Sequence, residues 1–231
     1  MSAMISDVLP GTSSQRILAA KASAERFSSM LSIDSLHFDL YEGTVVDASD
    51  TRNIFLCSDI LQGIHAALSY EAGEAWKIVL YRCGFLWGQK TLRYFVRQSQ
   101  GAFGAKFEQI SVDTFLGNLV TFMNFNGWGV LSFDLKHATT HGVLRFELRK
   151  SIFSDALEHL RERVDFMIAG MLAGIFSDLA CTELECIELC SALTGAPTSI
   201  FLLSAKERIE ALRGALDGGA DERELLERLC G

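Results

Sequence analysis

Apolar residues recur at helical spacing along much of the chain and predict several helices. The longest spans residues 155–180, with Ser154 and Asp155 as its expected cap. Its apolar stripe consists of Val164, Met167, Met171, Ile175 and Leu179. The stripe of a second long helix, over 74–98, consists of Trp76, Leu80, Cys83, Trp87 and Tyr94. Shorter apolar periods predict helices over 11–31, 58–73, 112–125, 205–217 and 222–229.

Polar signals mark where some of these helices begin. Ser204 and Glu207 have capping-box spacing before the helix at 205–217. Asp221 and Glu224 form the weaker aspartate version before the last helix. Ser111 precedes the helix at 112–125. These positions are expected to fix the helix starts.

Alternating stretches rich in β-formers predict strands that lie in local pairs. They cover residues 36–46, 54–57, 129–137, 142–149, 181–191 and 199–203. His137 to His141 joins one pair, and Thr194 to Pro197 joins the last. Because strands do not alternate with helices, the predicted fold class is α+β, with an antiparallel sheet of hairpins packed against long helices.

Each long helix carries two glycines four residues apart, Gly84 with Gly88 and Gly170 with Gly174. Such spacing lets another backbone approach closely, and the two helices are expected to pack there. The alternative is a slot between the paired grooves, lined by Phe85, Trp87 and Met171. The sequence leaves both possibilities open.

Composition favours one compact domain. The chain has 231 residues, 49% of them hydrophobic, with 16 Phe and 2 Pro, so it can bury a large core. We expect an N-terminal helix and strand over 1–50 for packing or dimerisation, a main body over 51–204, and C-terminal helices over 205–231. No linker rich in Pro, Gly or Ser separates these segments.

Charge and hydropathy limit the partners. The net charge of −8 disfavours broad binding to nucleic acid or anionic lipid, since both require a basic face. No apolar run is long enough for a transmembrane segment, and the N-terminus lacks a signal pattern, so we expect a cytoplasmic protein. The six cysteines are therefore expected to stay reduced.

The sequence contains few groups with recognisable chemistry. It has no nicotinamide, flavin or phosphate-binding motif and no nucleophile elbow, so we predict no catalytic residues. His65 lies among Ala and Leu, and is either a core imidazole or an axial ligand to a porphyrin metal. His137 and His141 flank a predicted turn, where solvent exposure is expected, and a role as ligands is the alternative.

Three side chains near the last hairpin are candidate metal ligands. On a regular strand Cys186, Glu188 and Cys190 would share one face, and thiolates with a carboxylate can bind zinc. The spacing matches no known zinc knuckle. The alternative, which we favour, is buried free cysteines that act as small hydrophobic residues.

Several short motifs occur in an order that resembles the 4-vinyl-reductase domain family. They are Arg52 to Leu56, LYRCGFLWGQ (80–89), Asn126 to Gly129, Ser151 to Phe153, AGMLAGIFS (169–177), and Cys190 through Gly195 to Phe201. The resemblance covers about 53–201. It implies the ligand-binding fold of the NO-signalling and Golgi-transport type, which phenol-sensor domains and TRAPP subunits share.

The resemblance also carries expectations about metal and ligand. Phenol-sensing members hold zinc with a cysteine before the glycine-bearing helix, a Glu-x-x-Cys pair, and a further cysteine after the turn. In this chain Val164, Ile187 and Thr198 or Ser199 fall at three of those positions, and only Cys190 matches, so zinc is not expected. The stand-alone photosynthetic or cyanobacterial branch, which the chain resembles most, implies a tetrapyrrole ligand, chlorophyll or bilin metabolism, and photosystem-assembly or pigment-synthesis partners.

The functional expectation is a non-catalytic carrier, as a homodimer, for a hydrophobic small molecule. An aromatic pocket between 74–98 and 155–180 would be walled by Trp76, Phe85, Trp87, Tyr94, Phe122, Phe166 and Met171, with His65 or Cys83 as polar handles. The alternatives are a structural adaptor with a filled core, or an accessory subunit of a vinyl reductase. An adaptor would show a wide apolar surface patch.

Overall fold

The computed structural model describes residues 31, 33–47, 50–103, 107 and 110–231. They form two compact units. The first contains residues 58–92 and 129–231, and the second contains the remaining described residues up to 57 together with 93–128. Each unit combines residues from more than one of the segments 1–50, 51–204 and 205–231 or divides them differently. The single compact domain expected from the composition stays a prediction. The predicted helix at 11–31 lies almost wholly outside the described residues.

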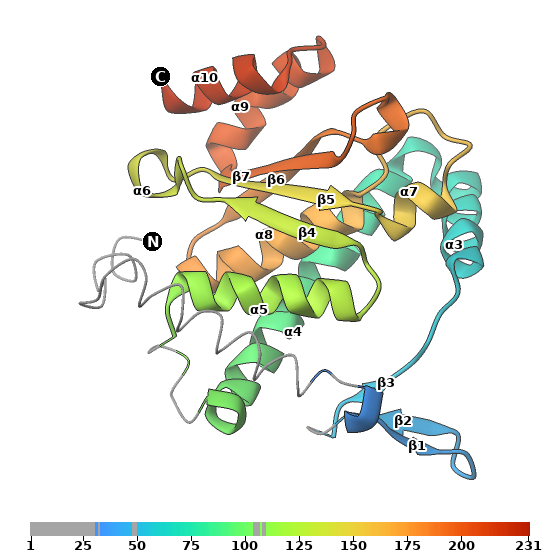
Figure 1. The fold of residues 1–231 in the computed structure, drawn as a ribbon. Helices are drawn as coiled ribbons and strands as arrows, with labels where there is room; N and C mark the ends of the chain where they lie inside the picture. Colours follow the sequence, from blue (N-terminus) through green and yellow to red (C-terminus); the bar gives the residue numbers. More distant parts are fainter. Residues whose placement is uncertain (1–30, 32, 48–49, 104–106, 108–109) are drawn as a thin grey trace. The chain divides into compact units, whose positions relative to one another are not determined.

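A four-stranded antiparallel sheet is the centre of the first unit (Figure 1). Its order is β4-β5-β7-β6. The strands are β4 (Val130–Asp134), β5 (Leu144–Arg149), β6 (Leu184–Cys190) and β7 (Ser199–Ala205). Phe146 pairs with Phe201, and Ile187 pairs with Leu202, so strands from both predicted hairpins meet in one sheet. The predicted α+β class with antiparallel hairpins is confirmed.

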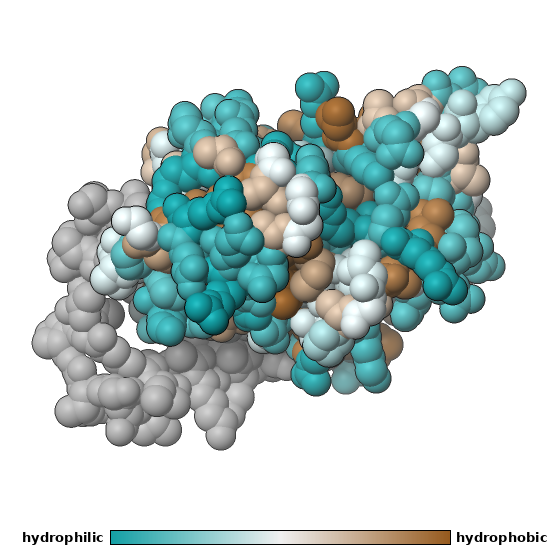
Figure 2. All heavy atoms as spheres, turned by 90° about the horizontal axis from the view of Figure 1, so that it is seen from above, coloured by the Kyte–Doolittle hydropathy of each residue, from teal (hydrophilic) through white to brown (hydrophobic). Residues whose placement is uncertain are grey.

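Helices cover both faces of this sheet. Helix α8 (Phe166–Ala180) packs on one face, where the ring of Phe176 lies 5.6 Å from that of Phe146. On the other face, α9 (Lys206–Asp217) and α10 (Glu222–Cys230) bury apolar side chains against β6 and β7. The outer surface over these two helices is largely hydrophilic, with scattered apolar side chains (Figure 2).

Helix α3 (Ser58–Ala72), the short turn η2 (Gly73–Ala75) and α4 (Trp76–Phe103) follow the predicted helices closely. At the contact of α4 with α8, a Cβ atom on Gly84 would overlap the carbonyl oxygen of Met167, and one on Gly170 would overlap that of Tyr81. Gly88 and Gly174 meet the opposite backbone in the same way. Close packing of the two helices is confirmed, and the alternative of an open slot at the glycines is wrong.

The second unit contains a small antiparallel sheet and two helical segments. Its strands are β1 (His37–Asp39), β2 (Thr44–Val46) and β3 (Arg52–Asn53), and they follow the turn η1 (Ile33–Ser35). Helix α5 (Val112–Phe125) begins where predicted, because the Ser111 side chain accepts a hydrogen bond from the Thr114 amide. The end of α4, from Arg93, belongs to the same unit.

Several sequence predictions are wrong in detail. The strand at 36–46 is two strands, because Gly43, at φ 64°, turns the chain between them. Residues 54–57 form no strand, and Ile54 is 72% exposed. Ser204 does not cap α9, since its hydroxyl donates to the carbonyl of Gly142. Asp221 does cap α10 as predicted.

The predicted central helix is interrupted. Ser151, and not Ser154, caps the short helix α7 (Ile152–Ala156), and α8 begins only at Phe166. The intervening chain is fixed by Asp165, whose buried carboxylate binds hydroxyl groups from β7 and from the start of α7. In the part of the chain that the structure describes, no helix has the length and apolar character needed to cross a membrane.

Candidate functional site

The residues predicted to line one pocket lie in separate places. Trp76 is buried, with its ring centroid 4.7 Å from that of His65 and 5.3 Å from that of Phe166. His65 shares a 3.1 Å hydrogen bond with Ser69, and burial lowers its pKa. These contacts support the interpretation of His65 as a core imidazole.

Of the other predicted residues of the first unit, Phe85 lines an open groove together with Phe166. Met171 is fully buried, and its carbonyl oxygen lies at the Gly88 notch. Phe85 and Trp87 are half-buried, and Cys83 is exposed. Tyr94 and Phe122 belong to the second unit. The nine residues therefore form no single pocket wall within either unit.

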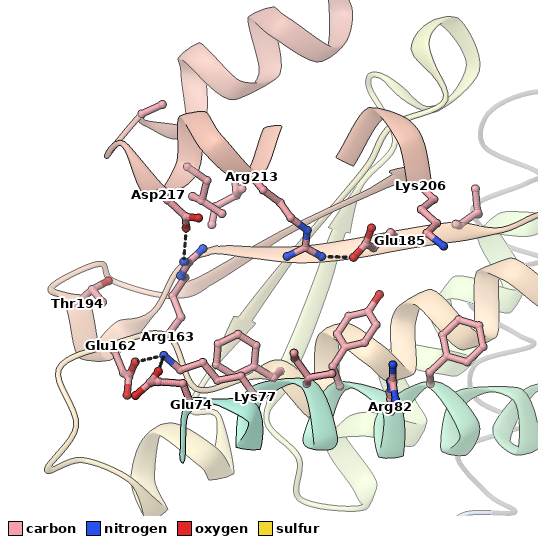
Figure 3. A pocket seen from close by; sticks show the side chains of 18 of the residues that line it. Glu74, Lys77, Arg82, Glu162, Arg163, Glu185, Thr194, Lys206, Arg213 and Asp217 are labelled. Atoms are coloured by element: carbon pink, nitrogen blue, oxygen red, sulfur yellow. Dashed lines mark hydrogen bonds and ion pairs between the residues drawn. The ribbon is translucent and has the colours of Figure 1, made fainter. Parts of the chain in front are cut away.

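A large open groove lies in the first unit between α4, β6 and α9 (Figure 3). Its volume is about 1510 Å³. The charged side chains that line it pair across it: Lys77 with Glu162, Arg163 with Asp217, and Arg213 with Glu185. Because these charges compensate one another, the groove offers no field of one sign, and apolar side chains such as Ile78, Leu86 and Phe166 line it as well.

A cluster of buried oxygen groups lies between α7, α8 and the sheet. Asp165 and Glu188 are 0% and 3% exposed. The Asp165 carboxylate accepts hydrogen bonds from Ser151 and from Ser199, the latter at 2.6 Å. The Asp165 amide donates to Glu188 Oε2 at 2.9 Å, while Glu188 Oε1 has no hydrogen-bond partner among the residues described. Two carboxyl groups thus share one dry site.

Burial raises the pKa of Glu188 well above its ordinary value of 4.5, and the adjacent Asp165 carboxylate adds to the shift. The folded state therefore retains the proton after the unfolded chain has lost it. As the pH rises from the ordinary value toward the folded-state pKa, this group's stabilising contribution is lost.

We expect the free energy of unfolding of the wild type, relative to that of Glu188→Gln, to decrease as the pH rises from about 5 to about 8. The reason is that glutamine mimics the protonated acid at every pH. Urea unfolding at the two pH values measures it. The exposed Glu207→Gln is the matched control and should leave the pH dependence of the wild type unchanged. A Glu188→Gln variant with the same pH dependence as the wild type would contradict the buried-proton interpretation.

This cluster adjoins the positions where the family resemblance implies zinc ligands, namely Val164, Ile187, Cys190 and Thr198 or Ser199. The cluster itself consists of Ser151, Asp165, Glu188 and Ser199. No thiol or imidazole is in the set, and its oxygen atoms bind one another. The donors do not fit a structural zinc ion.

The candidates Cys186, Glu188 and Cys190 do not converge. The ladder of β6 is irregular between Glu188 and Cys190. As a result Cys190 packs with the apolar cluster around Ile187 and Leu189, while Glu188 binds the Asp165 amide beside α8. Burial raises the pKa of the Cys186 thiol well above its usual range, in line with a small hydrophobic role.

In the second unit, the end of α4 and helix α5 make an aromatic contact. The ring centroid of Phe95 lies 5.5 Å from that of Phe115 and 5.6 Å from that of Phe122. Tyr94 adds a ring 6.1 Å from Phe122. Of the predicted pocket residues, Tyr94 and Phe122 are therefore brought together here.

Asn118 lies on the same helix as two of these rings, Phe115 and Phe122. It lies three residues after Phe115 and four before Phe122, so the three residues share one face of α5. Asn118 is 2% exposed, and its Oδ1 atom has no hydrogen-bond partner in the described part of the chain. A second amide, Gln98, is buried one helical turn beyond Phe95 on α4. This part of the second unit thus combines packed aromatic rings with a buried amide oxygen that has no hydrogen-bond partner among the described residues.

Asn118 was absent from the residues predicted from the sequence. The signal that could have found it is the helical period, because Phe115, Asn118 and Phe122 follow one another at spacings of three and four. An amide at an apolar position of a helix stripe is unusual and calls for a partner.

Comparison with known proteins identifies the fold. Neither a family model nor a curated protein matches the sequence. Among solved structures, the phenol-responsive sensory domain of the transcription activator PoxR, crystallised with phenol, is 19% identical and has a TM-score of 0.64. The match covers 86% of this chain and 97% of that domain. This chain has the fold of that sensory domain.

Two further structures give lower scores. One is subunit 3 of a trafficking protein particle complex from Naegleria fowleri, covalently bound to palmitic acid, with 14% identity, a TM-score of 0.47, and coverage of 64% of this chain and 95% of that one. The other is a vinyl-4-reductase family protein from Methanocaldococcus jannaschii, with 13% identity, a TM-score of 0.44, and coverage of 66% and 83%.

Proposed function

We propose that this chain is a non-catalytic binding domain for a small hydrophobic molecule that carries a hydrogen-bond donor. The observation that carries the proposal is the unpaired Oδ1 atom of Asn118, buried on the helix face between Phe115 and Phe122. A ring or flat apolar body would contact the phenylalanines, and its hydroxyl or N–H group would donate to the amide oxygen.

The energetic argument concerns the unpaired acceptor. A buried acceptor without a partner costs about 1–3 kcal/mol relative to one that is hydrogen-bonded. A ligand that supplies the donor removes this cost on binding, and a ligand of the same shape without a donor does not. The site is therefore expected to discriminate strongly between the two.

The fold comparison supports the same chemistry. The sensory domain with which this chain shares its fold was crystallised with phenol, an aromatic ring with one hydroxyl group. A phenol-class ligand combines the apolar body and the single donor that the Asn118 site requires.

A tetrapyrrole, expected from the family resemblance, is the more specific candidate. Its ring N–H groups are donors, and its flat body would need a long aromatic slot. The slot considered between α4 and α8 is closed by Gly84 and Gly170 against the opposite helix. The tetrapyrrole proposal, with pigment metabolism and photosystem assembly as its setting, therefore depends on the resemblance and on the Asn118 site.

Calorimetric titration with phenol, toluene and a chlorophyllide or bilin tests the proposal. We expect phenol to bind wild type, and toluene, which lacks the hydroxyl, to bind at least about tenfold more weakly. Asn118→Leu should lose this discrimination while gaining about 1 kcal/mol in unfolding free energy without ligand, because the unpaired oxygen is gone.

The matched control is Asn124→Leu, at an exposed position of the same helix. It should leave affinity and discrimination unchanged. Binding of the tetrapyrrole alone would select the pigment version. A folded wild type that binds none of the three ligands would contradict the proposal.

A second candidate function, an adaptor or homodimer contact, is favoured by one surface. In the second unit Phe38 stacks on Phe55 at 5.9 Å, yet the two residues are 47% and 67% exposed. Leu40, Ile54 and Leu56 are exposed on the same unit. An exposed ring pair with further exposed apolar side chains on the same unit is typical of an interaction surface. A contact through this surface and ligand binding at Asn118 are compatible, because the surface and the Asn118 site consist of different residues.

A further inference from the structure

Two histidines and a cysteine that are far apart in the sequence meet at one end of the first unit. The ligand atoms of His137, His141 and Cys230 all lie within 4.8 Å of one another. All three residues are half-buried. Among the residues that the structure describes, no other group of three histidine, cysteine or acidic side chains comes this close.

The histidines converge because the segment between β4 and β5 is a helical turn and not the exposed turn that the sequence predicts. Helix α6 (Ala138–His141) forms when the His141 amide donates to the carbonyl of His137 at 3.0 Å. Gly142, at φ 63°, ends it in the left-handed conformation. Residues four apart on a helical turn share a face, and the two imidazole centroids lie 5.8 Å apart.

Cys230 is brought to the histidines by the packing of α10. Leu225 and Leu229 of this helix are buried in the apolar cluster over β6 and β7. Arg208 of α9 then ties the two segments together, since its guanidinium donates to the carbonyl of His141 and to that of Leu229. The Arg208 side chain thus fixes the backbone of His141 and that of Leu229, the residue before Cys230.

We propose that His137, His141 and Cys230 form a binding site for a single divalent metal ion of the zinc class. Two imidazole nitrogens and one thiolate are a borderline-soft donor set that suits Zn²⁺. In a tetrahedral zinc site the ligand atoms lie about 3.3–3.8 Å from one another. Side-chain rotations that move the imidazole nitrogens and the thiol sulfur by about 1 Å therefore bring the three ligand atoms to these distances around one ion.

The fourth coordination position of this metal site is open to a groove. His137 and Cys230 line a depression of about 540 Å³ together with residues of α10, Leu226 and Glu227 among them. A water molecule from this depression would complete the coordination of a bound ion. Because the ligands come from α6 and from the end of α10, the bound ion clamps the last helix to the sheet.

Titration of the reduced, metal-free protein with Co²⁺ tests the proposal, since cobalt reports thiolate and tetrahedral coordination by colour. We expect one Co²⁺ per chain, with a thiolate charge-transfer band and visible bands that excess Zn²⁺ removes. Cys230→Ser should lose the charge-transfer band and bind more than about 100-fold more weakly, since even residues that only orient a ligand contribute roughly 10–100-fold.

His141→Gln is the second variant, and it should retain a weakened charge-transfer band without tetrahedral visible bands. The matched control is Cys181→Ser, which removes an exposed cysteine of the same unit and should behave as the wild type. A wild-type protein that shows no stoichiometric cobalt spectrum would overturn the assignment. So would a Cys230→Ser variant that keeps the wild-type cobalt spectrum while Cys181→Ser loses this spectrum.

Discussion

Gly170→Ala is expected to lower the free energy of unfolding by at least about 3 kcal/mol, at the upper end of the range for overpacked cores. A Cβ atom there would overlap the carbonyl oxygen of Tyr81 and lie 2.8 Å from its carbonyl carbon. Both are backbone atoms, so no side-chain rotation relieves the contact. The two helices would have to separate along a buried interface.

Gly214→Ala in α9 is the matched control. No atom lies within 4 Å of a Cβ built at this helical position, so the substitution should stabilise the protein by up to about 1 kcal/mol through helix propensity. Urea unfolding of the two variants measures the difference. Equal effects would show that the α4–α8 contact is looser than the structure indicates.

Asp165→Ala is expected to lower the free energy of unfolding by about 3 kcal/mol. The carboxylate accepts from Ser151, which caps α7, and from Ser199 of β7. Removing it leaves two buried hydroxyl groups without their acceptor.

The control for Asp165 is Asp155→Ala, an exposed aspartate in the first turn of α7. Its loss should cost less than about 1 kcal/mol, the usual value for a carboxylate near a helix N-terminus. Thermal or urea unfolding distinguishes the two. A small loss at Asp165 would mean that the buried cluster does not hold the segment between α7 and α8.

Local signals predict much of this fold. The helical periods place α3, α4, α5 and α8, and the turn at Thr194 to Pro197 places the hairpin of β6 and β7. The glycine spacing predicts the backbone contact between α4 and α8, because only glycine permits it.

What the sequence does not reveal depends on contacts between distant residues. The break before Asp165 comes from hydroxyl groups 14 and 34 residues away. The ladder in β6 is irregular between Glu188 and Cys190, so Cys190 does not share the face of Glu188 as it would on a regular strand. The pairing of His137 and His141 with Cys230 depends on the docking of α10, which no local pattern encodes.

The central claim is that a small hydrophobic donor binds beside Asn118, and amide NMR spectroscopy with phenol as the probe tests it most directly. We expect saturable shifts to concentrate on residues 93–98 and 112–125, and to disappear in Asn118→Leu. Shifts that concentrate instead on the groove residues Lys77, Arg163 and Arg213, or no shifts at saturating phenol, would contradict the account.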